Sequence, residues 1–329
     1  MARIVLMGTP QFGVPILEAL MRCHRVLAVV TQPDRVAGRG RSRRLASPVK
    51  LAAESSGVAV LQPARLRRNT EILRALRALG ADLFVVVAFG QIIPADILAI
   101  PPHGCIGVHA SLLPKLRGAA PIAAAILGGD EETGVTLMLT DAGIDTGPII
   151  VQRRLAIAPR DTTETLSRKL SHLGAELLIE TLPGWLAGEI EPRPQDDTQA
   201  TYAPMIAKSD GAIDWQSTAT EIDRMIRGFT PWPGAYTSYR GKTLKILRAC
   251  PGSAMSARGI SLRSTASATL PPQHERQVPG TVIESEGEMA VVTGDGLLLL
   301  ERVQLAGKKA MDAKAFVRGQ RDWVGSVLA

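Results

Sequence analysis

The chain has 329 residues, of which 46% are hydrophobic, and a formal net charge of +7. This length predicts about two domains. The sequence contains neither the apolar run of roughly 18 residues that a membrane helix needs nor the pattern of a signal peptide. We therefore expect a cytoplasmic protein without a membrane partner. The wide spacing of the cysteines argues against a disulfide framework and a zinc site: they are Cys23, Cys105 and Cys250. We therefore expect no metal.

Short apolar runs alternate with helix-spaced segments along the first half of the chain. The expected strands are 3–8, 26–31, 59–61, 83–88, 105–108 and 135–139, and the expected helices are 10–22, one from about 48, 70–79 and 161–182. This alternation predicts a parallel α/β sheet with both faces covered. Ligands of such sheets bind beyond the carboxyl ends of the strands, where we expect His109 and Asp145. A nicotinamide site is the weakest reading, because Gly8-Thr9-Pro10 is not a G-x-G-x-x-G motif.

The pattern changes after a polar, proline-bearing stretch at 189–201. We expect a linker at 189–208, a helix at 218–229, and then short strands at 235–239, 243–249, 280–285, 290–293 and 296–300. Several short strands separated by turn residues predict a small barrel of the oligonucleotide-binding kind. The segment 251–279 is rich in Ser, Ala and Pro and is expected to be a surface insertion.

A basic cluster separates two of the expected elements in the first half. The residues from Arg35 to Lys50 include six basic side chains and no acidic one. Such a cluster is an electrostatic candidate for binding a polyanion. The alternative is a solvated surface loop, which is how most runs of charge occur.

Motifs along nearly the whole chain resemble those of the methionyl-tRNA formyltransferases, which use 10-formyltetrahydrofolate. The N-terminal ones are Met-Gly-Thr-Pro at 7–10, Thr-Gln-Pro-Asp-Arg at 31–35, Ala-Gly-Arg-Gly at 37–40, Ser-Pro-Val-Lys at 47–50, Ser-Leu-Leu-Pro at 111–114 and Arg-Gly-Ala-Ala-Pro-Ile at 117–122. The C-terminal ones are Ile-Asp-Trp at 213–215, Pro-Trp-Pro at 231–233 and Gly-Lys-Lys-Ala-Met at 307–311. Ser-Leu-Leu-Pro alone indicates only the folate, whereas the full set indicates the tRNA enzyme.

The resemblance implies a fold, a reaction and a set of site residues. It implies a Rossmann-like formyltransferase domain at 1–188, the linker, and an OB-like tRNA-binding domain at 209–329. It implies formyl transfer from 10-formyltetrahydrofolate to methionyl-initiator tRNA by a monomer. The implied catalytic residues are His109 and Asp145; the folate site is Ser111, Leu112, Leu113, Pro114 and Asp141; and the tRNA contacts are Arg39, Arg41, Arg43 and Arg44.

One position departs from the family pattern. The residue two before the histidine is expected to be Asn, and here it is Gly107. Glycine cannot supply the carboxamide donor, and loss of one oxyanion donor costs about 100- to 1,000-fold in turnover. We therefore expect impaired or rerouted catalysis. A non-catalytic tRNA- or folate-binding protein and a formyltransferase for a small amine such as a nucleotide sugar remain as alternatives.

Overall fold

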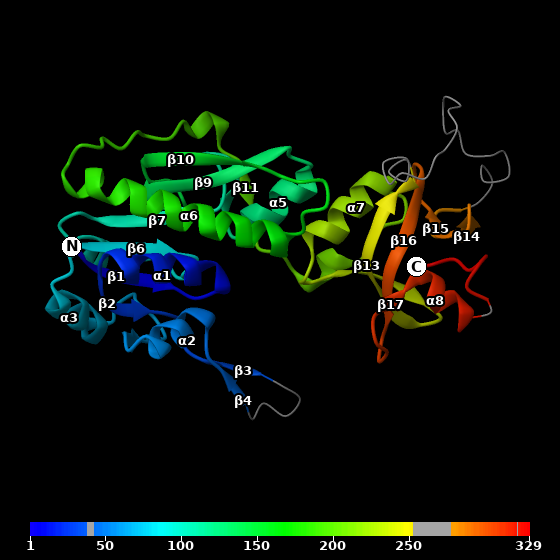
Figure 1. Ribbon diagram of the computed structural model, residues 1–329, viewed down its shortest axis with the longest axis horizontal. Helices are drawn as coiled ribbons and strands as arrows, with labels where there is room; N and C mark the ends of the chain where they lie inside the picture. Colours follow the sequence, from blue (N-terminus) through cyan, green and yellow to red (C-terminus); the bar gives the residue numbers. More distant parts are fainter. Residues whose placement is uncertain (38–42, 253–277, 321) are drawn as a thin grey trace. The chain divides into compact units, whose positions relative to one another are not determined.

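The computed structural model describes residues 1–37, 43–252, 278–320 and 322–329, which form two compact units (Figure 1). Unit 1 comprises 1–122, 131–157 and 165–205, and unit 2 comprises 123–130, 158–164 and 206–329.

The core of unit 1 is a seven-stranded sheet in the order β10-β9-β7-β6-β1-β2-β5. Its strands are β1 (Arg3–Gly8), β2 (Arg25–Val30), β5 (Ala59–Leu61), β6 (Leu83–Val87), β7 (Cys105–His109), β9 (Glu132–Leu139) and β10 (Ile149–Ala156). The strands from β7 to β5 are parallel. This arrangement confirms the predicted α/β class.

The edge formed by β9 and β10 differs from the sequence prediction, because β9 is antiparallel to β7 and β10 is antiparallel to β9. A parallel neighbour needs a crossover that returns the chain to the start of the sheet, and that crossover is usually a helix packed on one face. Helix α5 (Pro121–Gly128) follows β7. Residues 123–130 nevertheless cluster with unit 2. The succession of β7, α5 and β9 thus has the element order of a crossover between parallel strands, but β7 and β9 are antiparallel.

Helices cover both faces of the sheet in unit 1. They are α1 (Val14–Cys23), α2 (Pro48–Ser55), α3 (Thr70–Leu79), α4 (Ala95–Leu98) and most of α6 (Thr163–Leu186). Local signals set some of the ends: the Asn69 side chain accepts from the Ile72 amide at the start of α3, and Gly80 ends that helix in the left-handed region at φ 59°. On one face, residues of α3 and α4 pack with Val5, Phe84 and Cys105. On the other, a close approach at Gly174 of α6 brings the helix against Val108 and Val135.

A short hairpin replaces part of the loop predicted between β2 and α2. Strands β3 (Arg35–Ala37) and β4 (Arg43–Leu45) pair antiparallel and extend away from the sheet (Figure 1). At the base of the hairpin, Lys50 Nζ donates to Asp34 at 2.8 Å and Gln62 Nε2 donates to the same carboxylate at 2.8 Å. These bonds hold the pKa of Asp34 below its ordinary value, with the Lys50 bond the largest cause. The base of the hairpin is therefore a cross-linked polar network.

The segment after α6 is attached to unit 1 by main-chain hydrogen bonds. Ile149 of β10 and Arg193 exchange both bonds, at 2.7 and 2.8 Å. Strand β11 (Tyr202–Ala203) then pairs with β8 (Arg117–Gly118). Between them lies a short 3-10 turn, η2 (Asp197–Gln199). Residues 193–203 of the predicted linker are thus ordered against the sheet domain, while the predicted domain boundaries themselves stay a prediction.

Unit 2 is a small β domain with a six-stranded antiparallel sheet. Its strands are β12 (Ala235–Tyr239), β13 (Lys242–Pro251), β14 (Val282–Ser285), β15 (Glu288–Val292), β16 (Leu297–Leu305) and β17 (Met311–Asp312), and its helices include α7 (Ala219–Gly228) and α8 (Ala313–Arg318). Residues 325–329 bridge the two outer strands: Ser238 of β12 donates to Ala329 at 2.6 Å, and Val282 of β14 donates to Ser326 at 2.9 Å. The bridge closes the sheet into the predicted barrel-like form.

Candidate active site

His109 is the last residue of β7, at the carboxyl end of a parallel strand. Its side chain is 9% exposed, and both ring nitrogens face acceptors. Nδ1 lies 3.5 Å from Oδ1 of Asp145, and Nε2 lies 2.9 Å from the carbonyl oxygen of Leu116. A neutral imidazole donates through one nitrogen only, whereas a protonated ring donates through both. A carboxylate therefore faces one nitrogen of the ring and a main-chain carbonyl faces the other.

Asp145 reaches His109 by a route that the sequence did not indicate. Because β9 is antiparallel to β7, its last residue Leu139 lies opposite Ile106 rather than His109. The loop 140–148 that follows β9 nevertheless brings the Asp145 carboxylate to His109, at the carboxyl end of β7. The main-chain N–H of Gly118 donates to Asp145 Oδ2 at 2.8 Å. The carboxylate is thus fixed by one oxygen and presents the other to the ring.

Both residues that contact the His109 ring have strained backbones. Asp145 has φ 55° and Leu116 has φ 58°, in the left-handed region that non-glycine residues rarely adopt. Such strain costs about 1–3 kcal/mol per residue and persists only where the surroundings over-determine it, which is common at functional sites. Two strained residues on one imidazole mark this part of the molecule as the candidate site.

Gly107 lies on the same sheet face as His109, two residues earlier in β7. Its φ is outside the left-handed region, so the backbone does not require glycine. A Cβ atom at this position would lie 3.0 Å from Met138 Cε and 3.0 Å from Thr140 Oγ1. Within the described part of the chain, Thr140 Oγ1 is buried and has no hydrogen-bond partner. The space beside Gly107 is therefore partly filled by neighbours.

The residues predicted to form the folate site divide into two groups. The loop 111–114 is anchored by side chains of β9 and β10. Thr136 Oγ1 of β9 accepts from the Leu113 N–H at 3.1 Å, and the Gln152 side chain of β10 donates to the Leu113 carbonyl at 2.8 Å. Asp141 instead bonds within its own loop, to the Gly143 amide at 3.0 Å and the Thr146 hydroxyl at 2.8 Å. The structure thus places the 111–114 loop beside His109 and gives Asp141 a local turn contact, while their folate roles stay predictions.

The arginines predicted to contact tRNA are only partly described. Arg39 and Arg41 lie outside the described residues, and for Arg43 the description covers the main chain alone. Arg44 is exposed on β4. Their predicted role therefore stays a prediction.

Sequence reasoning missed the polar contacts behind Asp145. Arg117, which is 2% exposed, bonds to Gln195, and Gln195 bonds to the main chain at Asp145 and Gly147. Arg117 was visible as part of the Arg-Gly motif, but nothing local connects residue 195 to residue 145. Only the folded chain brings these residues together.

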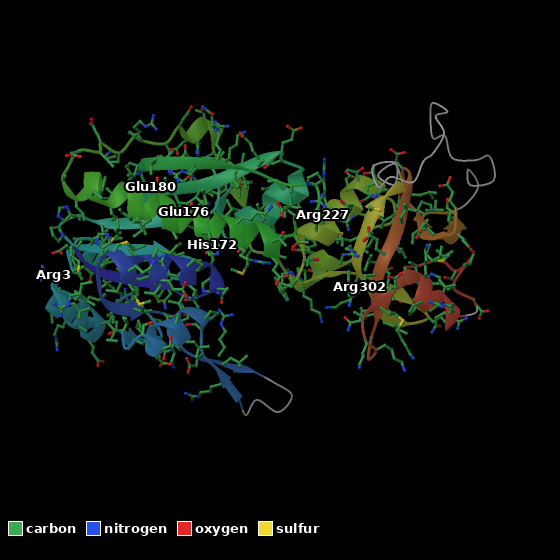
Figure 2. All side chains as sticks on the ribbon, viewed as in Figure 1. Arg3, His172, Glu176, Glu180, Arg227 and Arg302 are labelled. Atoms are coloured by element: carbon green, nitrogen blue, oxygen red, sulfur yellow. The ribbon has the colours of Figure 1, made fainter. Side chains whose placement is uncertain are left out.

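Other candidate chemistry in the described residues is weak. Burial raises the pKa of the Cys105 thiol to about 12, so a thiolate at this position is disfavoured. Among the described residues, no group of three or more His, Cys, Asp or Glu side chains could hold a metal ion. A hollow of about 380 Å³ between α1 and α6 includes His172 and Glu176, labelled on α6 in Figure 2, but shares no residue with the His109 site.

Comparison with known proteins places the chain in a family. The formyl transferase model matches residues 2–182, and the model of the formyl transferase C-terminal domain matches residues 205–321. The chain belongs to the formyl transferase family. Curated methionyl-tRNA formyltransferases match it at full length: that of Caldanaerobacter subterraneus is 44% identical over 99% of both chains, and that of Myxococcus xanthus is 46% identical over 98% of this chain and 97% of its own. The resemblance seen in the sequence is confirmed.

Solved structures support the fold of this formyl transferase. The sugar 3N-formyl transferase WlaRD, solved with dTDP and 5-N-formyl-THF, has a TM-score of 0.63 at 19% identity and covers 94% of this chain and 99% of its own. HypX from Aquifex aeolicus in complex with tetrahydrofolic acid has a TM-score of 0.59 at 15% identity, covering 98% of this chain and 48% of its own. Within the described residues, no helix is long and apolar enough to cross a membrane. Membership of the formyl transferase family and the full-length match to curated methionyl-tRNA formyltransferases make the chain an enzyme that transfers one-carbon formyl groups.

Proposed function

We propose that this formyl transferase moves the formyl group of 10-formyltetrahydrofolate to the α-amino group of methionine carried by initiator tRNA. The observation that carries the proposal is the full-length match, at 44–46% identity, to curated methionyl-tRNA formyltransferases. That match includes the C-terminal domain, which the formyl transferase C-terminal model covers from 205 to 321. A folate donor is supported by structural relatives whose own complexes hold folates. Formylated methionyl-tRNA would serve translation initiation.

The proposed chemistry needs one proton carrier and one donor to the developing oxyanion. The amine nitrogen attacks the formyl carbon, the bond from that carbon to N10 of the folate breaks, and the proton lost by the amine is balanced by the proton gained at N10. We assign the proton transfers to His109. Nε2 can exchange its partner, the Leu116 carbonyl, for the substrate, while Nδ1 stays beside Asp145. Asp145 then keeps the ring oriented and balances its charge.

The missing donor at Gly107 sets the expected rate. The position has no side chain, so the oxyanion lacks the carboxamide donor that the resemblance implies. Removing such a donor lowers turnover by about 100- to 1,000-fold. Slow but measurable transfer is the expected behaviour.

The basic hairpin is proposed as the tRNA-facing element. Arg44 is exposed on β4, opposite Val36 in the antiparallel pair. Arginine side chains on a narrow projecting hairpin can pair with phosphates, and such contacts weaken as salt rises. We propose Arg39, Arg41 and Arg43 as partners of the same kind.

The acceptor is tested by comparing three amines with one donor. Purified protein is incubated with 10-formyltetrahydrofolate and with methionyl-initiator tRNA, free methionine or a nucleotide amino sugar, and the formylated product is quantified. We expect product with the charged tRNA and little with the others. Efficient transfer to the amino sugar would favour the small-amine alternative. Tight, salt-dependent tRNA binding without any transfer would favour the non-catalytic one.

A further inference from the structure

The side chain of Gln195 connects a buried arginine to the loop that carries Asp145. Its Nε2 donates to the carbonyl oxygens of Asp145, at 2.9 Å, and Gly147, at 2.7 Å. Its Oε1 accepts from Nε of Arg117 at 3.1 Å and from Nη2 at 2.8 Å. Every hydrogen-bonding direction of the amide is thereby used, on one side by the Asp145 loop, 50 residues earlier in the chain, and on the other by Arg117, 78 residues earlier.

The orientation of this amide is fixed by chemistry. Arginine has only donors, so the oxygen of Gln195 must face Arg117 and the nitrogen must face the two carbonyls. Arg117 is itself 2% exposed, and its Nη2 also donates to Asp197 at 2.7 Å, whose side chain is 83% exposed. A buried charge without partners is costly, so this anchor does not move freely. Gln195 therefore presents its nitrogen to the loop from a rigid support.

The loop needs such a support. Asp145 has φ 55°, a strained conformation for a residue other than glycine. The loop is also tightly packed, because a Cβ at Gly147 would lie 1.8 Å from the Leu139 carbonyl oxygen. The Gly118 amide holds the carboxylate of Asp145, and Gln195 holds its main chain. The two contacts act on different parts of the same residue and together fix the direction of the carboxylate toward His109.

We propose that Gln195 is a positioning residue for the catalytic pair, with Arg117 as its anchor, so that the segment after α6 is part of the active site. The proposal rests on the proposed function, in which His109 and Asp145 carry the proton transfers. Gln195 acts through Asp145 and touches no substrate. Its contribution to the rate comes from holding the pair in the reactive geometry, and a displacement of about 1 Å can cost 100-fold.

The sharpest variant is Gln195→Glu, because it keeps the shape and the acceptor for Arg117 but turns the donor nitrogen into an oxygen that repels the two carbonyls. We expect kcat to fall about 10- to 100-fold with KM for both substrates changed less than about threefold. Gln195→Met, which removes both the donor nitrogen and the acceptor oxygen, should lower kcat to a similar extent. The matched control is Gln199→Ala in the same segment. Among the described residues, the Gln199 side-chain amide donates to Asp196 and not to the Asp145 loop, so this variant should keep the parent kcat.

Two further measurements separate positioning from general loss of structure. In an Asp145→Asn background, Gln195→Glu should lower kcat no further than about twofold, since coupled residues are not additive. The ¹⁵N chemical shift of His109 Nδ1 should move in Gln195→Met in the same direction as in Asp145→Asn, and stay in place in Gln199→Ala. Independent, multiplying losses, or an unmoved His109 signal in folded Gln195→Met, would overturn the proposal. If the parent chain transfers no formyl group while the signal still moves, the proposed function fails and the positioning role stands.

Discussion

Replacing Gly107 with Asn should raise formyl transfer sharply. The backbone at 107 has no left-handed φ, so an asparagine meets no conformational penalty there. Its Cβ would lie 3.0 Å from Met138 Cε, 3.0 Å from Thr140 Oγ1 and 3.3 Å from Met138 Cγ, so the Met138 and Thr140 side chains must each shift by a few tenths of an ångström. The carboxamide can also pair with the Thr140 hydroxyl, which is buried and without a partner in the described residues.

The expected effect of Gly107→Asn combines the gain in kcat from the new donor with the change in stability from crowding the site. An added oxyanion donor is worth about 100- to 1,000-fold in kcat. Crowding a packed site costs about 1–3 kcal/mol of stability, which a new hydrogen bond of about 1 kcal/mol partly offsets. The strand also gains about 0.5–1 kcal/mol from losing a flexible glycine. We therefore expect Gly107→Asn to increase kcat by about 100-fold with little change in thermal stability.

The assay is single-turnover formylation of methionyl-initiator tRNA, with the variants compared at equal folded concentration. Gly107→Ala is the matched control, because it adds the same Cβ and meets the same two side chains without supplying a donor. It should leave kcat within about threefold of the parent. A gain in Gly107→Ala equal to that in Gly107→Asn would refute the donor argument, as would a folded Gly107→Asn with no gain.

Three other predictions concern stability and reactivity. The pKa of Asp34 is lowered in the folded state, so the ionised carboxylate stabilises the fold above about pH 4. This stabilisation is lost as the pH falls through the folded pKa. The urea midpoint of Asp34→Asn should therefore depend less on pH in this range than the midpoint of the parent chain. Leu328 is 2% exposed and lies in the segment that closes the barrel, so Leu328→Ala should lower the free energy of unfolding by about 2–5 kcal/mol. The neighbouring Val327 is exposed, and Val327→Ala should leave that free energy nearly unchanged. A thiol reagent should label exposed Cys23 in the native protein and buried Cys105 only after unfolding, and equal labelling would contradict the assigned burial.

Elements with local signals could be predicted from the sequence. Helix α3 occupies 70–79 as predicted, because an asparagine cap and a C-terminal glycine mark both ends. Strand β7 was predicted at 105–108 for a similar reason, since a short apolar run ends at a polar residue; the structure extends the strand by one residue to include His109. Such signals depend on residues a few positions apart.

Features that depend on distant residues could not be predicted. The antiparallel direction of β9 relative to β7 could not be predicted. A helix follows β7, as it would in a crossover between parallel strands, yet residues 123–130 of that segment cluster with the other unit. The polar segment after α6 has the composition of a linker, but its Gln195 is engaged with residues 117, 145 and 147. His109 and Asp145 were both expected at strand ends from the sequence, but their roles as a catalytic pair came from the family resemblance, since nothing in their spacing of 36 positions specifies a contact.

The central claim is that His109, oriented by Asp145, transfers protons while a formyl group passes from 10-formyltetrahydrofolate to methionyl-initiator tRNA. The most direct test is single-turnover formylation with the parent chain, His109→Ala and Asp145→Asn, each confirmed to be folded. The account predicts slow transfer by the parent, a loss of about 100-fold or more in His109→Ala, and an intermediate loss in Asp145→Asn. Transfer by folded His109→Ala at the rate of the parent would contradict it.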